Sequence, residues 1–145
     1  MAGKYRLPIP LAPTWVRWLG VLTGATILFY FSIVQAVPQP PRGVTALWDK
    51  QLHFAGYAGL GLAIAYATAT IRSRRRRFLL ILGGAIAYGV LIELLQAPLP
   101  NRYYSPTDML ANTIGALLAT SWLLLEDYIQ YVPLQSANRK RIPPR

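Results

Sequence analysis

The chain of 145 residues contains no cysteine and only five acidic residues, which narrows the chemistry it can carry. Without cysteine, disulfides and thiolate metal sites are excluded. Charged residues make up 14% of the sequence, about half the share that is usual in soluble domains. Hydrophobic residues reach 54% and the mean hydropathy is +0.32. This composition is typical of an integral membrane protein.

Four apolar segments are each long enough to cross a bilayer as a helix. They run from about Val16 to Val37, Phe54 to Ile71, Phe78 to Leu95 and Met109 to Leu125. Each has roughly 17–22 residues, enough at about 1.5 Å per residue to cover a hydrocarbon core of about 30 Å. None alternates apolar with polar residues as barrel strands do. We therefore expect an all-α integral membrane bundle of four transmembrane helices.

Prolines and arginines punctuate these segments. The run "VPQPP" (37–41) should end the first helix and "APLP" (97–100) the third, because proline lacks an amide donor and clashes with the preceding turn. The run "SPTD" (105–108) should start the fourth helix, with serine as the cap and proline in the first turn. The run "RSRRRR" (72–77) should form a short turn between the second and third helices.

The basic residues predict how the bundle is oriented. Twelve of the 15 lysines and arginines lie in the N-terminal part, the 72–77 turn or the C-terminal part, leaving Arg42, Lys50 and Arg102 for the other side. Because basic residues accumulate on the cytoplasmic side, we expect both termini and the arginine-rich turn to be cytoplasmic. The loops that hold the remaining three should face outward, and the host membrane should be the cytoplasmic membrane.

The expected organisation is a membrane domain at 16–128 between a cytoplasmic N-terminus (1–15) and a basic C-terminal tail (129–145). The first apolar segment could instead be a signal peptide cleaved near "VQA" (34–36), although it exceeds the usual apolar length of about 7–15 residues. The net charge of +10 could indicate nucleic-acid binding. The uneven placement of that charge favours a topology signal, so we expect the lipid bilayer and no nucleic acid as a partner, although the arginine-rich turn could also contact anionic lipid head groups.

Polar residues gather at the outward ends of the last three segments. The members of this candidate functional cluster are Asp49, His53, Glu93, Gln96, Arg102, Asp108 and Asn112. Those on the same segment are three or four positions apart and so share a helix face. Polar groups at membrane depth are costly and usually face a bundle interior or a water-filled cavity. We therefore expect these side chains to meet at the outer membrane surface.

Structural roles remain open for several of these residues. Asp49 could simply complement the positive end of its helix, and Asp108 could form a capping box with Ser105. His53 could be a satisfied interface histidine, and Asn112 could bond a neighbouring helix. Glu93 is the hardest to explain in this way, because its carboxylate lies inside an apolar segment near the C-terminal end of a helix. It needs a partner, for which Arg102 and His53 are the candidates.

Three runs in this region carry a family resemblance. They are "DKQLHFAGYAGLG" (49–61), "YGVLIELLQ" (88–96) and "NRYYSPTDMLANTIGALL" (101–118). In this order they resemble the VanZ-like family of small membrane proteins over about 49–119. The resemblance implies an extracytoplasmic role, since the founding member is associated with low-level resistance to the glycopeptide teicoplanin. No settled biochemical activity defines the family, and Asn101 stands where it often has glycine, which leaves the loop conformation open.

The first functional hypothesis is recognition of a cell-envelope or lipid-linked head group. Arg102 and His53 would contact a phosphate or carboxylate, since the arginine fork fits such oxyanions. Gln96 and Asn112 would supply neutral hydrogen bonds, and Glu93 would orient Arg102.

Two further hypotheses stay open. A membrane-embedded hydrolase or transferase acting on lipid-linked phosphates could use Asp49 to orient His53 and Glu93 as an acid or base, although no G-x-S-x-G nucleophile motif is present. Alternatively, the protein is a structural subunit of a membrane complex. We expect no cofactor and no metal, while noting that His53, Asp49, Glu93 and Asp108 carry groups that can ligate a divalent ion.

Overall fold

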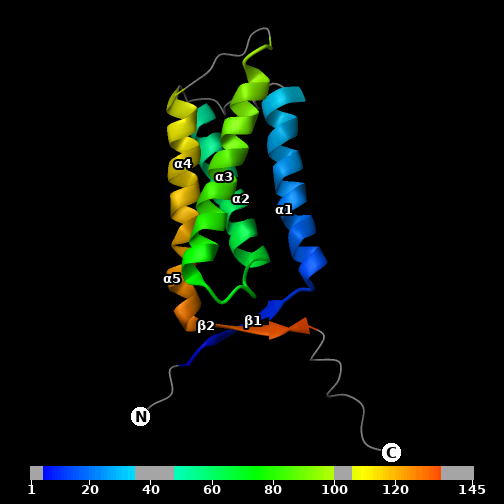
Figure 1. Cartoon of the computed structure of the whole chain (residues 1–145), viewed down its shortest axis with the longest axis vertical. Coiled ribbons are helices and arrows are strands. Elements are labelled where there is room, and N and C mark those ends of the chain that lie inside the picture. Colours follow the sequence, from blue (N-terminus) through cyan, green and yellow to red (C-terminus); the bar gives the residue numbers. More distant parts are fainter. Residues whose placement is uncertain (1–4, 35–47, 100–105, 135–145) are drawn as a thin grey trace, which may run out of the picture.

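The computed structural model describes residues 5–34, 48–99 and 106–134, where four long helices stand side by side above a small sheet (Figure 1). In chain order the elements are β1 (Leu7–Leu11), α1 (Thr14–Phe29), the π-helical turn η1 (Tyr30–Val34), α2 (Trp48–Ala67), α3 (Arg74–Gln96), α4 (Pro106–Thr120), α5 (Trp122–Leu125), the 3-10 turn η2 (Glu126–Tyr128) and β2 (Ile129–Pro133). The chain is thus an all-α membrane-type bundle with one two-stranded addition.

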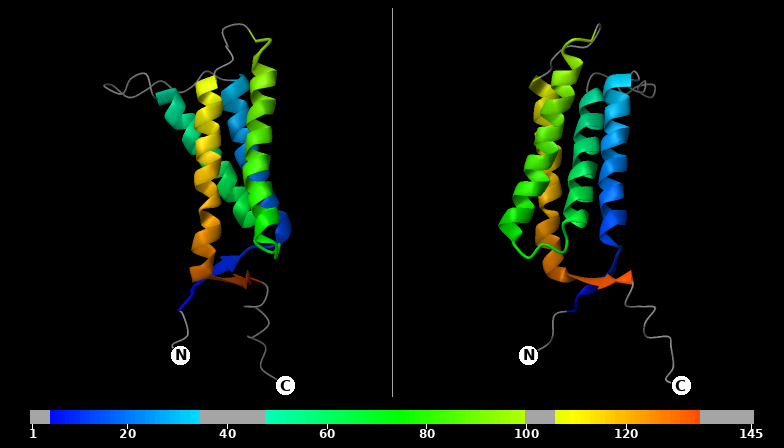
Figure 2. Two further views of the ribbon diagram at one scale, coloured as in Figure 1. Left: turned by 60° about the vertical axis from the view of Figure 1, so that its left-hand side comes forward. Right: turned by 45° about the vertical axis from the view of Figure 1, so that its right-hand side comes forward.

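Three helical units in the described part of the chain are long and apolar enough to cross a membrane. They are Thr14–Val34, Arg74–Gln96 and Pro106–Tyr128. The fourth expected span, α2, has 20 residues, but polar side chains such as Lys50 and His53 occupy its first turns. It lies among the other three helices, as two further views show (Figure 2).

The core forms where α2 crosses α4, and it depends on small residues. A Cβ atom on Gly115 would lie 2.3 Å from the Phe54 carbonyl oxygen, and one on Gly61 would lie 2.6 Å from the Cβ of Ala119. Only glycine permits this separation of the two backbones. Gly115 and Ala119 are four positions apart on α4, so they share one face of that helix, and both are buried.

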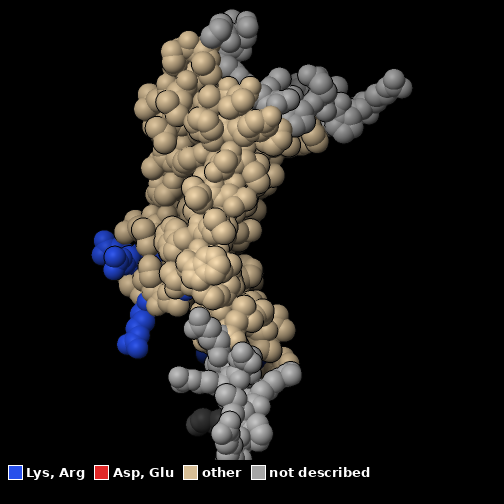
Figure 3. All heavy atoms as spheres, turned by 90° about the vertical axis from the view of Figure 1, so that its right-hand side faces the viewer, with Lys and Arg blue, Asp and Glu red and all other residues tan. Residues whose placement is uncertain are grey.

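The outside of the bundle is apolar. Leucines from three helices are prominently exposed, including Leu22 at 62%, Leu79 at 57% and Leu118 at 55%. Figure 3 shows a wide face without a visible Asp or Glu, with Lys and Arg confined to its lower part. An apolar belt of this extent on an isolated chain fits lipid contact, because soluble monomers rarely expose such continuous apolar surface.

A parallel pair of strands closes the lower end. β1 pairs with β2 from Leu7 opposite Ile129 to Leu11 opposite Pro133. The Tyr66 hydroxyl, near the end of α2, accepts a hydrogen bond from the Ala12 amide and donates one to the Pro10 carbonyl, each at 2.9 Å. This sheet, which the sequence did not predict, therefore joins both ends of the described chain to the base of the bundle.

The helix boundaries confirm two of the four predicted breaks and correct one. The third helix ends at Gln96, before the 97–100 run, and α4 begins at Pro106. The 37–41 run and Ser105 lie outside the described residues. The arginine run is not the predicted turn, because α3 already begins at Arg74, where the Ser73 hydroxyl accepts a hydrogen bond from the Arg76 amide. Because Ser73 acts as the N-cap, the helix begins inside the arginine run.

Candidate functional site

The beginning of α2, the end of α3 and the beginning of α4 lie together at the upper end of the bundle, opposite the sheet (Figure 1). We call the polar side chains described there the polar cluster; its members are Lys50, His53, Glu93, Gln96, Asp108 and Asn112. Four of them are buried although they are polar, with exposed fractions between 4% and 9%. Burial at this level is costly unless each group finds a partner.

Side chains of α2 and α4 bond directly to one another. His53 Nδ1 lies 3.1 Å from Asn112 Oδ1, and His53 Nε2 lies 3.9 Å from Asp108 Oδ2. Lys50 forms an ion pair with the same Asp108 carboxylate. Because an amide oxygen only accepts hydrogen bonds, this arrangement puts a proton on Nδ1 and leaves Nε2 facing the carboxylate. The imidazole is thereby held between an amide and an acid.

The α3 side of the polar cluster is built on a glycine. A Cβ atom on Gly89 would lie 3.3 Å from Asn112 Nδ2 and 3.2 Å from Cε1 of Tyr57. One turn further along α3, Glu93 is only 4% exposed, and its carboxylate interacts electrostatically with the Tyr57 hydroxyl. Among the described residues, that hydroxyl is buried and has no hydrogen-bond partner. Tyr57 therefore adds an available donor beneath the polar cluster.

Gln96 is used differently from the expectation. Its Nε2 donates a 2.8 Å hydrogen bond to the Ser32 carbonyl oxygen in η1. A π-helical turn displaces the normal backbone hydrogen-bond ladder, so a side-chain donor readily finds a carbonyl there. Gln96 thus attaches α3 to the end of the first helix.

Two predicted members and two predicted contacts fall outside the described part of the chain. Arg102 lies outside the described residues, and so does the side chain of Asp49, whose backbone belongs to the first turn of α2. For the same reason, the structure does not describe the expected pairing of Glu93 with Arg102 or the expected capping box of Ser105 with Asp108.

Two residues of this end, Lys50 and Tyr57, were not among the predicted site residues. Lys50 precedes His53 by three positions and Tyr57 follows it by four, so both share its helix face. That spacing was the signal in the sequence that could have identified them. Among the described residues, no three His, Asp or Glu side chains are grouped so that they could hold a metal ion.

A second buried polar network lies at the opposite end and was also not predicted. Arg17, 4% exposed, donates to the carbonyl oxygens of Tyr66 at 3.2 Å and Ala67 at 2.8 Å. Arg77, 6% exposed, donates to the Ala65 carbonyl at 2.8 Å and forms an ion pair with Glu126. The last turn of a helix has carbonyls without intrahelical partners. Two guanidinium groups supply those partners for α2.

Tyr131 of β2 completes this second network. Its hydroxyl donates to Glu126 Oε1 at 2.6 Å and accepts from Trp122 Nε1 at 3.0 Å. Burial, reinforced by the hydrogen bond to the Glu126 carboxylate, raises the pKa of Tyr131 to about 12. The arrangement holds the strand against α5 and is suited to structural support.

Comparison with known proteins agrees with this geometry. A family model described as VanZ/LLP1 matches residues 10–126. The match includes the first helix and the arginine run, which both lie outside the three runs that carry the resemblance in the sequence. No curated protein and no solved structure matches the chain.

Proposed function

Because the chain belongs to the VanZ/LLP1 family, we propose that it is a multi-pass protein of the cytoplasmic membrane in which α1 to α4 all cross the bilayer. In this arrangement both termini are cytoplasmic and the polar cluster faces outward. Support comes from the arginines of the 72–77 run, which lie at the sheet end, and from α2, which lies among three helices that are apolar enough to span.

We further propose that the polar cluster binds the anionic head group of a lipid-linked or other cell-envelope molecule. The observation that carries this is the His53 imidazole held between Asn112 and Asp108 at the end opposite the arginines. Lys50 forms an ion pair with Asp108, and we assign the contacts with a phosphate or carboxylate to Arg102 and the His53 imidazole. Tyr57 supplies a neutral donor below them.

Lipid retention by purified protein tests this function. Native mass spectrometry would compare the wild type with Arg102→Ala, His53→Ala and Glu93→Gln after extraction from envelope membranes. Hydrogen bonds to charged groups contribute about 1.5–3 kcal/mol, so each of the first two changes should weaken binding about tenfold to a hundredfold. Glu93→Gln should act more weakly because the amide keeps the size and one acceptor of the carboxylate.

Arg6→Ala is the matched control, since it removes one exposed cation beside β1 at the opposite end. Wild-type lipid retention and wild-type teicoplanin sensitivity in Arg102→Ala and Glu93→Gln, at equal expression, would end the head-group proposal.

A second candidate function is acid–base catalysis on a lipid-linked phosphate. It is favoured by the approach of His53 Nε2 to within 3.9 Å of Asp108, because a carboxylate beside an imidazole can stabilise its protonated form. Release of phosphate from a lipid-linked substrate would be measured with wild type and His53→Gln. Turnover by the wild type alone supports the enzyme; binding without turnover supports the head-group receptor.

A further inference from the structure

Three arginines at the sheet end have no partner within the described chain. Arg72, Arg75 and Arg76 are exposed, and none of their guanidinium groups takes part in a described hydrogen bond or ion pair. In the same run, Arg74 donates to the Leu123 carbonyl and pairs with Asp127 at 3.5 Å. The run therefore contains arginines that bond within the protein and arginines whose side chains are exposed.

The three exposed arginines, Arg72, Arg75 and Arg76, lie where an apolar span begins. The span Arg74–Gln96 starts inside the run, and at the same end the span Thr14–Val34 starts beside Trp15, which is 70% exposed. Exposed tryptophan is typical of the level of lipid head groups. Figure 3 shows basic atoms at one side of the lower half of the molecule, where they project from the uncharged surface.

An open groove of about 660 Å³ lies at this end, between the start of α1, the end of β1 and the end of β2. Leu11, Pro133 and Leu134 make its walls largely apolar, while Thr70 and Arg17 add polar groups. Thr70 precedes Arg72 by two residues, so their Cα atoms are at most about 7 Å apart. A groove with apolar walls close to the exposed Arg72 fits a phospholipid, which is apolar next to its phosphate.

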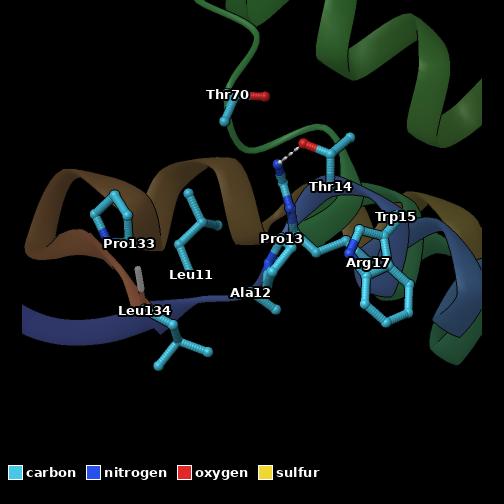
Figure 4. A pocket seen from close by; sticks show the side chains of 9 residues that line it. All are labelled: Leu11, Ala12, Pro13, Thr14, Trp15, Arg17, Thr70, Pro133 and Leu134. Atoms are coloured by element: carbon cyan, nitrogen blue, oxygen red, sulfur yellow. Dashed lines mark hydrogen bonds between the residues drawn. The ribbon is translucent and has the colours of Figure 1, made fainter. Parts of the chain in front are cut away.

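Arg17 itself is already engaged and acts as part of the wall. Figure 4 shows its side chain rising past the groove to Thr14, to whose hydroxyl Nη2 donates at 3.0 Å. Its other hydrogen bonds go to backbone carbonyls of α2. The anionic group of a ligand is therefore expected at the three exposed arginines. The glycerol and the first methylenes of the ligand are expected in the groove.

We propose that this end of the protein binds an anionic phospholipid, with its phosphate at Arg72, Arg75 and Arg76 and its glycerol backbone in the adjoining groove. Charge complementarity selects the partner, since a bilayer surface supplies anionic phosphates directly beside an apolar interior. The proposal concerns the end opposite the polar cluster and does not depend on the head-group function proposed there.

Four single substitutions within one run give a matched test. Purified protein would be titrated with phosphatidylglycerol and, separately, phosphatidylcholine in mixed micelles, and bound lipid counted by native mass spectrometry. Arg72→Gln, Arg75→Gln and Arg76→Gln should each weaken phosphatidylglycerol binding about fivefold, the effect of one basic residue near an anionic surface. Arg74→Gln removes the same charge from the same run but should weaken binding less than about twofold, because that guanidinium is already bonded internally.

The groove has its own variant. Thr70→Trp places an indole in the groove without removing a charge, and it should reduce binding of the two-chain lipid. As a control, inorganic phosphate should compete with lipid binding equally weakly in the variant and in the wild type. Equal affinity of the wild type for both lipids, equal effects of all four arginine variants, or displacement of lipid by a short DNA duplex at physiological salt would each overturn the proposal. Unchanged lipid binding in Thr70→Trp would overturn the part assigned to the groove.

Discussion

At the sheet end of the bundle, the buried Arg17 and Arg77 bond to backbone carbonyls of α2 as well as to side chains, whereas at the opposite end His53 and Lys50 of α2 bond to side chains of α4. Arg17 and Arg77 take three consecutive carbonyls from the last turn of α2. His53 and Lys50 take the side chains of Asn112 and Asp108. Carbonyls of a helix cannot change partners without unfolding the turn, while side chains can rotate toward a ligand. We therefore interpret the sheet end as structural support, and the rotatable side chains of the other end favour the recognition role proposed for it.

The strongest test of this comparison is to remove the buried cation at the sheet end. Arg77→Ala leaves the Glu126 carboxylate without its counter-ion and removes one donor from the Ala65 carbonyl, so the free energy of unfolding should fall by about 3–5 kcal/mol. Thermal unfolding in detergent measures it. Arg75→Ala, an exposed arginine two residues away, is the control and should stay within about 0.5 kcal/mol of the wild type. Equal melting temperatures for the two variants would contradict the supporting role.

The contact of α2 with α4 joins the two ends and should be nearly as sensitive. Gly115→Ala places a methyl group against the Phe54 carbonyl oxygen and must push the two helices apart, which should cost about 1–3 kcal/mol. Gly83→Ala is a matched control because nothing lies within 4 Å of its added Cβ, and alanine favours a helix. Melting curves of both variants decide the matter; a stabilised Gly115→Ala would show that the helices do not approach so closely.

At the end that holds the polar cluster, loss of one side chain should matter less for stability. Asn112→Ala removes the hydrogen-bond partner of His53 Nδ1 and should destabilise the protein by about 1–3 kcal/mol, at or below the effect of Arg77→Ala. Thr113→Ala, on the neighbouring position, loses only a bond to the Met109 carbonyl within its own helix. If Asn112→Ala unfolds the protein more readily than Arg77→Ala, the polar cluster is structural and the contrast between the ends disappears.

The smallest expected effect is a pH dependence confined to the sheet end. The pKa of Tyr131 is raised to about 12, above the usual value near 10, because the neutral phenol is favoured in the folded state. Its contribution to stability is therefore complete below about pH 10 and is lost as the pH rises through about 12. Tyr131→Phe should flatten the melting temperature over this range relative to the wild type, whereas Tyr5→Phe, an 86% exposed tyrosine, should not.

Much of the bundle could be predicted because apolar length and helix breakers act locally. The segment from Phe78 lies within α3, the described part of the segment from Val16 is helical, and the segment from Met109 lies within the helical unit Pro106–Tyr128. The predicted start of α4 at the proline is correct. The sheet could not be predicted, since each strand has five residues and β1 contains two prolines. Its strands gain their stability from pairing across the whole chain, and a local pattern contains no record of that pairing.

The candidate site shows the same division. That polar residues such as His53, Asp108 and Asn112 meet at one end follows from helix length and spacing, and the structure brings these three together. The choice of partner did not follow: Gln96 reaches a carbonyl in η1, and Lys50 joins Asp108. Which arginine becomes buried likewise depends on which carbonyls are left open by the packing of other helices.

The pairing of β1 with β2 has a consequence for biosynthesis. β1 precedes every described helix in the chain and β2 follows them all, so the first strand leaves the ribosome long before its partner exists. Glu126 is also translated late, so Arg77 has no Glu126 counter-ion until the fourth helix has been translated. The strand pair and the Arg77–Glu126 ion pair can form only after the last helix has been made, so a chain terminated before β2 lacks the strand pair.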